Sequence, residues 1–275
     1  MRVSLCNEVL GEFDFARQCA LARQFGYDGI EIAPFTLSDD PPRLTAAQRS
    51  EIRKAAAEHG LAITSLHYLL RAPAGLSITS ADSAQRNRTI ELMHGLCGLA
   101  ADLGARILVH GSPGQRKLAN ERDDDGRKRG ADCFAAVAQA ARAADVVYCI
   151  EPLSRDQTAF VNTIEEAAEI VRQIDSPAVR TMLDCSSAGL AETESVPDLI
   201  RRWLPTGLIA HVHFNDPNRR GPGDGALDFG PILEALRKQD YRGDAAIEPF
   251  IYEPDGPACA QRGIAYIRRL MATAP

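Results

Sequence analysis

Several features that mark common protein classes are missing from this chain of 275 residues. No apolar run approaches the roughly 20 residues that span a bilayer, and the first residues, MRVSLCNEVLG, lack the leader pattern of a signal peptide. No run of Lys and Arg is long enough to follow a phosphate backbone, and the formal net charge is −6. We therefore expect a cytoplasmic protein that binds neither membranes nor nucleic acid.

The sequence also lacks any CxxC pair, although it contains seven cysteines between Cys6 and Cys259. Their odd number and their position in apolar segments predict reduced, mostly buried thiols. No Pro- or Ser-rich linker or shift in composition divides the chain. Residues 1–275 are therefore expected to form a single domain.

Short apolar runs rich in β-branched residues alternate with longer helical patterns along the whole chain, which is typical of parallel strands joined by helical crossovers. Eight strands are expected, at Arg2–Cys6, Gly29–Ala33, Ala62–His67, Arg106–His110, Val146–Glu151, Arg180–Asp184, Ile209–Phe214 and Ala245–Phe250. No GxGxxG follows the first strand, and eight regular units in a chain close to the roughly 250 residues of one barrel favour closure. The fold class is therefore α/β, a single (β/α)8 TIM barrel, with an open doubly wound sheet as the alternative.

Local signals place several helix boundaries. A capping box of Thr45 and Gln48 opens a helix over Leu44–His59, and Thr163 with Glu166 repeats the signal ahead of Ala167–Gln173. Glycines that follow helical patterns are expected to end helices just before a strand, at Gly26, Gly60, Gly104 and Gly243.

Six consecutive strands are expected to end on ionisable side chains, namely His67, His110, Glu151, Asp184, His213 and Glu248. The active site of such a barrel is built at the carboxyl ends of its strands, so these groups are expected to meet at one rim. Buried carboxylates and imidazoles need compensation, which a divalent cation supplies directly. Taken singly, a strand-end glutamate is more often a cap or an ion-pair partner, and Asp184 could cap a turn. Their joint placement favours a metal site.

The expected metal ligands are Glu151, Asp184, His213 and Glu248. Three carboxylates and one imidazole suit Mn²⁺, with Mg²⁺ or Co²⁺ as alternatives, whereas zinc would prefer thiolates and closed tetrahedral geometry. Other polar residues allow two interpretations each. His67 and His110 are either structural or in contact with substrate, Glu31 either binds substrate or pairs with a neighbouring Arg, and Arg116 is either a substrate clamp or a solvated charge.

These motifs together resemble the xylose isomerase-like barrel superfamily of sugar isomerases and epimerases, over essentially the whole chain. The resemblance is carried by GYDGIE at residues 26–31, IEPL at 150–153, Leu183-Asp184, HVHFND at 211–216, Arg219 with GPGDG at 221–225, and IEPF at 247–250. Ketose 3-epimerases of this superfamily are especially similar. The resemblance implies the same four metal ligands and a substrate-binding role for Arg219. Two residues depart from the pattern, because Gln157 replaces a glutamate and Ser187 replaces a histidine that contacts sugar.

The expected function is a divalent-metal-dependent isomerase or epimerase that transfers a proton next to a carbonyl of a sugar or sugar phosphate, through an enediolate. Glu151 and Glu248 would be the catalytic acid and base, and His67, His110, Ser187 and Arg219 would contact substrate. The main alternative is a keto-polyol dehydratase similar to inosose dehydratase. A non-catalytic sugar-binding barrel and a DNA repair enzyme similar to endonuclease IV are weaker alternatives, since Ser187 removes one histidine of the latter's zinc cluster. Self-association into a homo-oligomer is left open.

Overall fold

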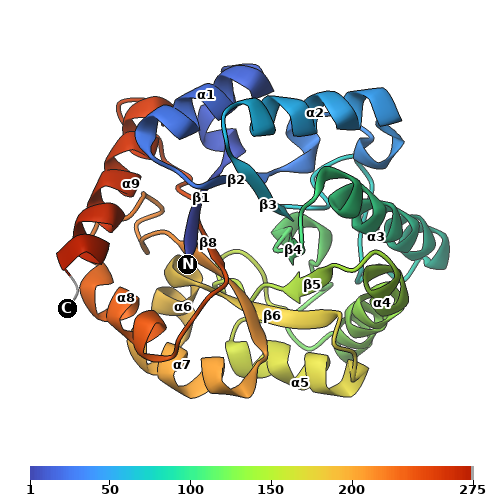
Figure 1. Ribbon diagram of the computed structural model, residues 1–275. Helices are drawn as coiled ribbons and strands as arrows, with labels where there is room; N and C mark the ends of the chain where they lie inside the picture. Colours follow the sequence, from blue (N-terminus) through green and yellow to red (C-terminus); the bar gives the residue numbers. More distant parts are fainter. Residues whose placement is uncertain (274–275) are drawn as a thin grey trace.

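The computed structural model describes residues 1–273, in which eight parallel strands follow one another around a closed barrel with the helices outside it (Figure 1). Pairing of β1 with β8, with Val3 opposite Ala245, closes the ring. The strands are β1 (Arg2–Cys6), β2 (Gly29–Ile32), β3 (Ala62–His67), β4 (Ile107–His110), β5 (Val147–Ile150), β6 (Val179–Asp184), β7 (Ile209–Phe214) and β8 (Asp244–Ile247). The expected (β/α)8 TIM barrel is confirmed.

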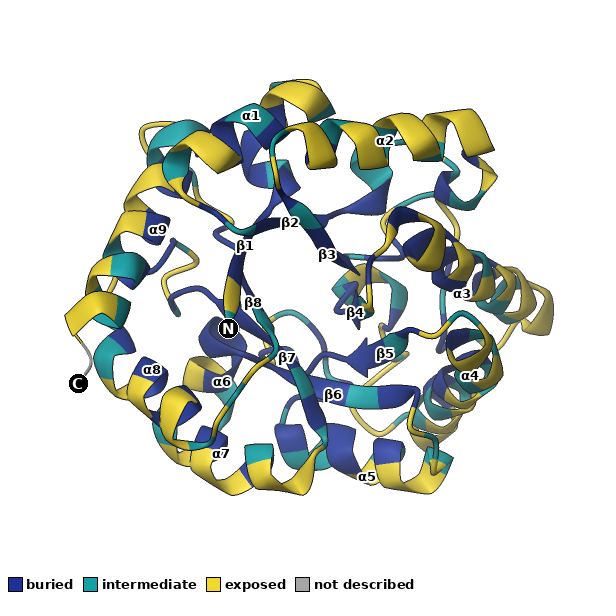
Figure 2. Ribbon diagram, in the orientation of Figure 1, coloured by how far each residue is buried: buried dark blue, intermediate teal, exposed yellow. Residues whose placement is uncertain are grey.

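The helices bury one face against the strands and expose the other (Figure 2). They are α1 (Phe15–Phe25), α2 (Ala46–Glu58), α3 (Ser83–Leu103), α4 (Asp124–Ala143), α5 (Ile164–Ile174), α6 (Cys185–Ala191), α7 (Val196–Trp203), α8 (Phe229–Lys238) and α9 (Gly256–Thr273). In α5, Ile164, Ala167, Ala168 and Val171 form the buried stripe at helical spacing. Within residues 1–273, none of the helices has the length and apolar character to cross a membrane.

Most of the expected helix boundaries are confirmed. Thr45 and Gln48 form the capping box of α2, and the Thr163 side chain accepts the N–H of Glu166 at the start of α5. Gly26 and Gly104 are left-handed C-caps of α1 and α3, and Gly60 follows α2 at φ 64°. The expectation for Gly243 is wrong. Helix α8 already ends at Lys238, and Asp240 takes the left-handed conformation at φ 52°, which short polar side chains tolerate.

A small apolar cluster of Val109, Cys149 and Met182 is separate from the main core between strands and helices, and we place it inside the barrel. Because side chains alternate along a strand, residues two positions further on also point inward. Glu151 and Asp184 follow Cys149 and Met182 at this spacing, one residue past β5 and at the end of β6 respectively. The seven cysteines are all free and buried, as expected.

Candidate metal centre and active site

The barrel register brings the four expected metal ligands to one height at the carboxyl ends of the strands. Asp184 lies opposite His213, and His213 lies opposite Ala246, two residues before Glu248. The Nδ1 atom of His213 lies 2.9 Å from Oε2 of Glu248, 3.7 Å from Oδ2 of Asp184 and 3.9 Å from Oε1 of Glu151. One ligand atom from each of the four residues lies within 4.8 Å of the others, and all four residues are buried.

The carboxylates of this group lie so close together that the pKa values of two of them are raised. Burial, followed by the neighbouring carboxylates of Glu248 and Asp184, raises the pKa of Glu151 to about 8. Burial also raises the pKa of Asp184. Burial and a neighbouring negative charge both disfavour the ionised form of a carboxylate, so raised pKa values are expected here. Three carboxylate donors and one imidazole nitrogen around a common point therefore fit a divalent cation.

Asn215 and Ser187 hold Asp184 in place. The Asn215 side chain donates to Oδ2 of Asp184 at 2.6 Å and to Oε2 of Glu248 at 3.4 Å, and it accepts the N–H of Ser186 at 2.8 Å. The N–H of Ser187 donates to Oδ1 of Asp184 at 2.6 Å, so Asp184 also caps helix α6. The turn-capping interpretation of Asp184 and the metal-ligand interpretation are therefore compatible, because each uses a different oxygen.

His67 lies beside Glu248 and not at the cavity mouth. Its Nδ1 atom is 2.9 Å from Oε1 of Glu248, and its Nε2 atom is 2.8 Å from Oε2 of Glu8. The ring is 1% exposed. Both nitrogens therefore already have carboxylate partners. Glu8, which the sequence did not single out, lies just after β1 in the short 3₁₀ helix Asn7–Leu10.

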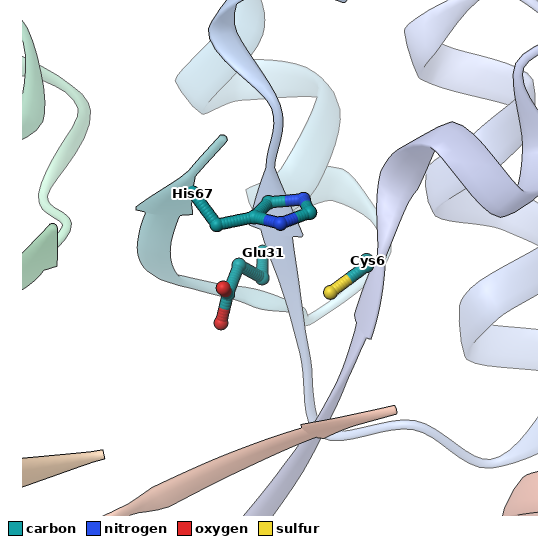
Figure 3. A group of neighbouring side chains, drawn as sticks. All are labelled: Cys6, Glu31 and His67. Carbon is teal, nitrogen blue, oxygen red and sulfur yellow. The ribbon is translucent and has the colours of Figure 1, made fainter. Parts of the chain in front are cut away.

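Glu31 is paired with histidines below the four-ligand group. Its Oε2 atom lies 2.7 Å from Nε2 of His211, and its Oε1 atom lies 2.9 Å from Nε2 of His213. Ser65 donates a further hydrogen bond to Oε2. Glu31, Cys6 and His67 come from three neighbouring strands, and their side chains lie close together (Figure 3). The partners of Glu31 are therefore two histidines and a serine, and not the neighbouring arginine that was one of its two expected interpretations.

A cavity of about 430 Å³ opens above the four-ligand group. A second one of about 110 Å³ shares its Glu151, Gln157, Arg219 and Phe250 wall and also reaches Glu248. The larger cavity is lined by Glu151, Leu153, Ser154, Arg155, Asp156, Gln157, Asp184, Ser186, Ser187, Leu190, Pro217, Arg219 and Phe250. Both residues that depart from the ketose 3-epimerase pattern, Gln157 and Ser187, therefore border the space in which a substrate would lie. The volume of the larger cavity, about 430 Å³, falls within the range of small-molecule sites.

Arg219 borders the cavity from the loop after β7, where it takes a left-handed conformation at φ 68°. Its guanidinium carbon lies 5.0 Å from the centroid of the Phe250 ring, a distance at which cation and ring attract. Its backbone oxygen accepts the N–H groups of Phe250 at 2.9 Å and Ile251 at 3.0 Å. The loops after β7 and β8 are thus joined at this residue.

The structure does not bring His110 to the cavity. It follows the inward-facing Val109 by one residue and so points outward, where Nδ1 lies 2.7 Å from the Tyr148 hydroxyl and the ring packs against Phe134 of α4. Arg116 is also fully buried, and its three guanidinium nitrogens have no hydrogen-bond partner within residues 1–273. Burial lowers the pKa of Arg116 to about 10. It is therefore not the solvated charge that the sequence allowed.

Comparison with known proteins agrees with the barrel fold. Residues 19–270 match the sequence model of the family described as xylose isomerase-like TIM barrel. The chain belongs to this family. Within the xylose isomerase-like barrels, it is 29% identical to a D-psicose 3-epimerase of Enterocloster bolteae, over 87% of this chain and 78% of the relative. It is 26% identical to a 3-dehydro-D-guloside 4-epimerase of Escherichia coli, over 98% and 99% of the two chains.

The solved structure of a D-psicose 3-epimerase in the presence of D-fructose superposes with a TM-score of 0.84 at 22% identity. The match covers 98% of this chain and 99% of that one. At this level of identity, the likeness supports the fold. The relatives found by sequence are sugar epimerases, and epimerases are isomerases, in agreement with the enzyme class expected from the sequence.

Proposed function

We propose that this protein is a divalent-metal-dependent sugar epimerase that moves a proton on a carbon next to a carbonyl. The observation that carries the proposal is that Glu151 and Glu248, two carboxylates that line one cavity, converge with Asp184 and His213. A barrel that only bound sugar would have no need for two buried carboxylates facing one cavity. The sugar 3-epimerases and 4-epimerase among the relatives support the same reaction class.

Glu151, Asp184, His213 and Glu248 would hold the cation, for which Mn²⁺ is the first choice and Mg²⁺ or Co²⁺ the alternatives. When bound, the cation would polarise the substrate carbonyl and stabilise the negative charge that develops on its oxygen. Asn215 keeps two of the carboxylates oriented through hydrogen bonds to Asp184 and Glu248. The protein would therefore supply a preorganised set of oxygen donors.

Proton transfer would be shared between two glutamates. Glu151 and Glu248 both border the smaller cavity, so a substrate carbon placed between them would present one face to each. One carboxylate would remove the proton and the other would return a proton to the opposite face, which inverts the carbon. We assign His67 to holding Glu248, because both of its ring nitrogens are engaged by carboxylates.

Substrate contacts are assigned to side chains that border the cavity. Arg219 would bind distal oxygens of the sugar, or a phosphate, and Ser187 would bind a hydroxyl near Asp184. His110, which points outward, has no part in this assignment. Because Ser187 and Gln157 replace a larger side chain and a charged one at this wall, the substrate preference is expected to differ from that of the D-psicose 3-epimerases.

The test is exchange with solvent deuterium. Protein loaded with Mn²⁺ would be incubated in deuterated water with free ketoses, aldoses, keto acids, their phosphates and 3-dehydro-glycosides, and the products read by NMR and mass. Epimerisation predicts deuterium on one carbon and an epimer of otherwise unchanged mass. A product lighter by one water would identify the dehydratase alternative, and affinity without any exchange would identify the sugar-binding alternative.

Glu248→Gln should nearly abolish exchange, because the amide can neither accept nor supply the proton. The matched control is Glu58→Gln, an exposed residue on α2, which should react like the wild-type protein. Full activity of the Glu248→Gln protein would rule out the assignment of Glu248.

A further inference from the structure

Glu31 is a buried carboxylate that the proposed reaction does not use. It is 0% exposed, it lies in the middle of the barrel on β2, and it lines neither cavity at the mouth. Three donors, from His211, His213 and Ser65, occupy its two oxygens. A carboxylate buried without such partners would be costly. The arrangement raises the question of what Glu31 does for the site above it.

One answer would be a second metal site, because Cys6, Glu31 and His67 offer ligand atoms within 4.8 Å of one another (Figure 3). The existing hydrogen bonds argue against it. Both oxygens of Glu31 and both ring nitrogens of His67 already have partners. Burial also raises the pKa of the Cys6 thiol, which disfavours the thiolate that a metal would need. A second ion would have to break this set of hydrogen bonds.

The geometry points to a different role: Glu31 is the positioning residue that makes His213 coordinate the cation through Nδ1. The Nε2 atom of His213 faces Glu31 at 2.9 Å, and because an ionised carboxylate can only accept, Nε2 is the donor of this hydrogen bond. Nδ1, which lies 2.9 Å from Oε2 of Glu248, would give up its proton to leave a lone pair for the cation among Glu151, Asp184 and Glu248. Metal-bound histidines usually donate their second N–H to such a carboxylate, and its removal typically costs 10–100-fold in metal affinity.

His211 and Ser65 give Glu31 a fixed orientation. His211 lies two residues before His213 on β7, and both rings point inward from the same face of the strand. Oε2 of Glu31 is hydrogen-bonded to His211 and Ser65, and Oε1 is hydrogen-bonded to His213. These bonds hold the carboxylate of Glu31, on β2, against the two histidines of β7. This inference rests on the proposed metal centre, but it concerns how the protein builds that centre and not which sugar it converts.

The test is calorimetric titration of metal-free protein with Mn²⁺ alone. Glu31→Gln keeps the size of the side chain but leaves one acceptor oxygen for two histidines, so Mn²⁺ affinity should fall by about 10–100-fold, with one ion per chain retained. Ser65→Ala removes one donor to Glu31 and leaves both histidine bonds, so its loss of Mn²⁺ affinity should be smaller than that of Glu31→Gln. The control is Glu58→Gln, an exposed residue on α2 outside this network, which should bind Mn²⁺ as tightly as wild type.

Two further measurements separate positioning from general damage. In a His213→Asn background, Glu31→Gln should cause no additional loss of Mn²⁺ affinity, because the interaction it supports is already gone. In wild-type protein loaded with diamagnetic Mg²⁺ or Zn²⁺, imidazole ¹⁵N NMR should show His213 bound through Nδ1 with a protonated Nε2. This second measurement needs no variant, so it decides the question even if Glu31→Gln fails to fold.

The inference is overturned if Glu31→Gln binds Mn²⁺ as tightly as wild type, or if His213 binds through Nε2. Two Mn²⁺ ions per wild-type chain, with one lost in Glu31→Gln, would instead establish a second metal site that includes Glu31. Failure of the proposed function is distinct. Wild-type protein that binds no metal would contradict the metal-dependent reaction itself, whereas tight binding without sugar turnover would leave the role of Glu31 intact.

Discussion

Replacing Gly111 by alanine should disable the active site, although no charged residue is substituted. Gly111 follows β4, and a Cβ built on it overlaps Oε2 of Glu151 and lies 3.1 Å from its Cδ. The φ angle of Gly111 lies outside the left-handed region, so alanine is compatible with the backbone. The Glu151 backbone is held by a hydrogen bond from its N–H to the carbonyl of His110 at 3.3 Å. The carboxylate, and not the chain, therefore has to move.

The required shift is on the order of 1 Å, a misplacement that can cost about 100-fold in rate. That loss corresponds to about 2.7 kcal/mol of transition-state stabilisation, at roughly 1.4 kcal/mol per tenfold. We therefore expect kcat/KM of Gly111→Ala to fall about 100-fold on whichever substrate the exchange assay identifies. Mn²⁺ affinity, measured by calorimetry, should weaken as well, because the same carboxylate is a ligand.

The control for this prediction lies on the same loop. A Cβ on Gly114 meets no atom within 4 Å, and the residue is exposed, so Gly114→Ala should match wild type in both measurements. Circular dichroism would establish that both variants are folded. If Gly111→Ala retains wild-type kcat/KM and Mn²⁺ affinity, then Glu151 is not confined against this loop, and its assignment as ligand and acid or base fails.

Three further predictions concern the cation, the thiols and Glu8. Metal at 100 times its Kd adds about 2.7 kcal/mol to the free energy of unfolding, so a chelator should lower Tm by roughly 5–10 °C. An unchanged Tm in differential scanning fluorimetry would contradict the cation site. Burial raises the pKa of Cys19 and Cys97 to about 12, and all seven thiols are buried, so Ellman's reagent should react with them quickly only in denaturant. Rapid reaction of several thiols in the native protein would refute this packing. Glu8→Gln removes the carboxylate that fixes His67, so kcat should fall about tenfold with KM retained, and an unchanged kcat would show that Glu248 needs no such support.

The four-ligand group could be predicted from the sequence because its members obey one rule, that polar residues at the ends of parallel strands meet at one rim. The same rule does not separate His110 from Glu151. Strand β4 reads Ile107-Leu108-Val109, which is apolar on both faces, so no local signal shows which alternate residues point inward. Only the packing of Val109 with Cys149 and Met182 decides it, and this places His110 outside the barrel.

Long-range partners were also beyond the reach of the sequence. The sequence places Glu31 within a strand, but its histidine partners lie on β7, 180 and more residues away. Glu8 and Asn215 likewise become relevant only once folding brings them to His67 and Asp184. At Gly243, the expected helix stop failed because Asp240 takes the left-handed turn first. Residue type predicts a tolerated conformation, and the neighbouring chain decides which residue adopts it.

The double hydrogen bond at the Arg219 carbonyl has a consequence for attempts to change what the enzyme accepts. Because that carbonyl holds the N–H groups of Phe250 and Ile251, the segment that carries the cavity arginine also determines the path of the segment that carries the facing aromatic ring. A chimera that imported only one of these segments from another epimerase would separate them. The two should be exchanged together, as one module, when new specificities are built on this barrel.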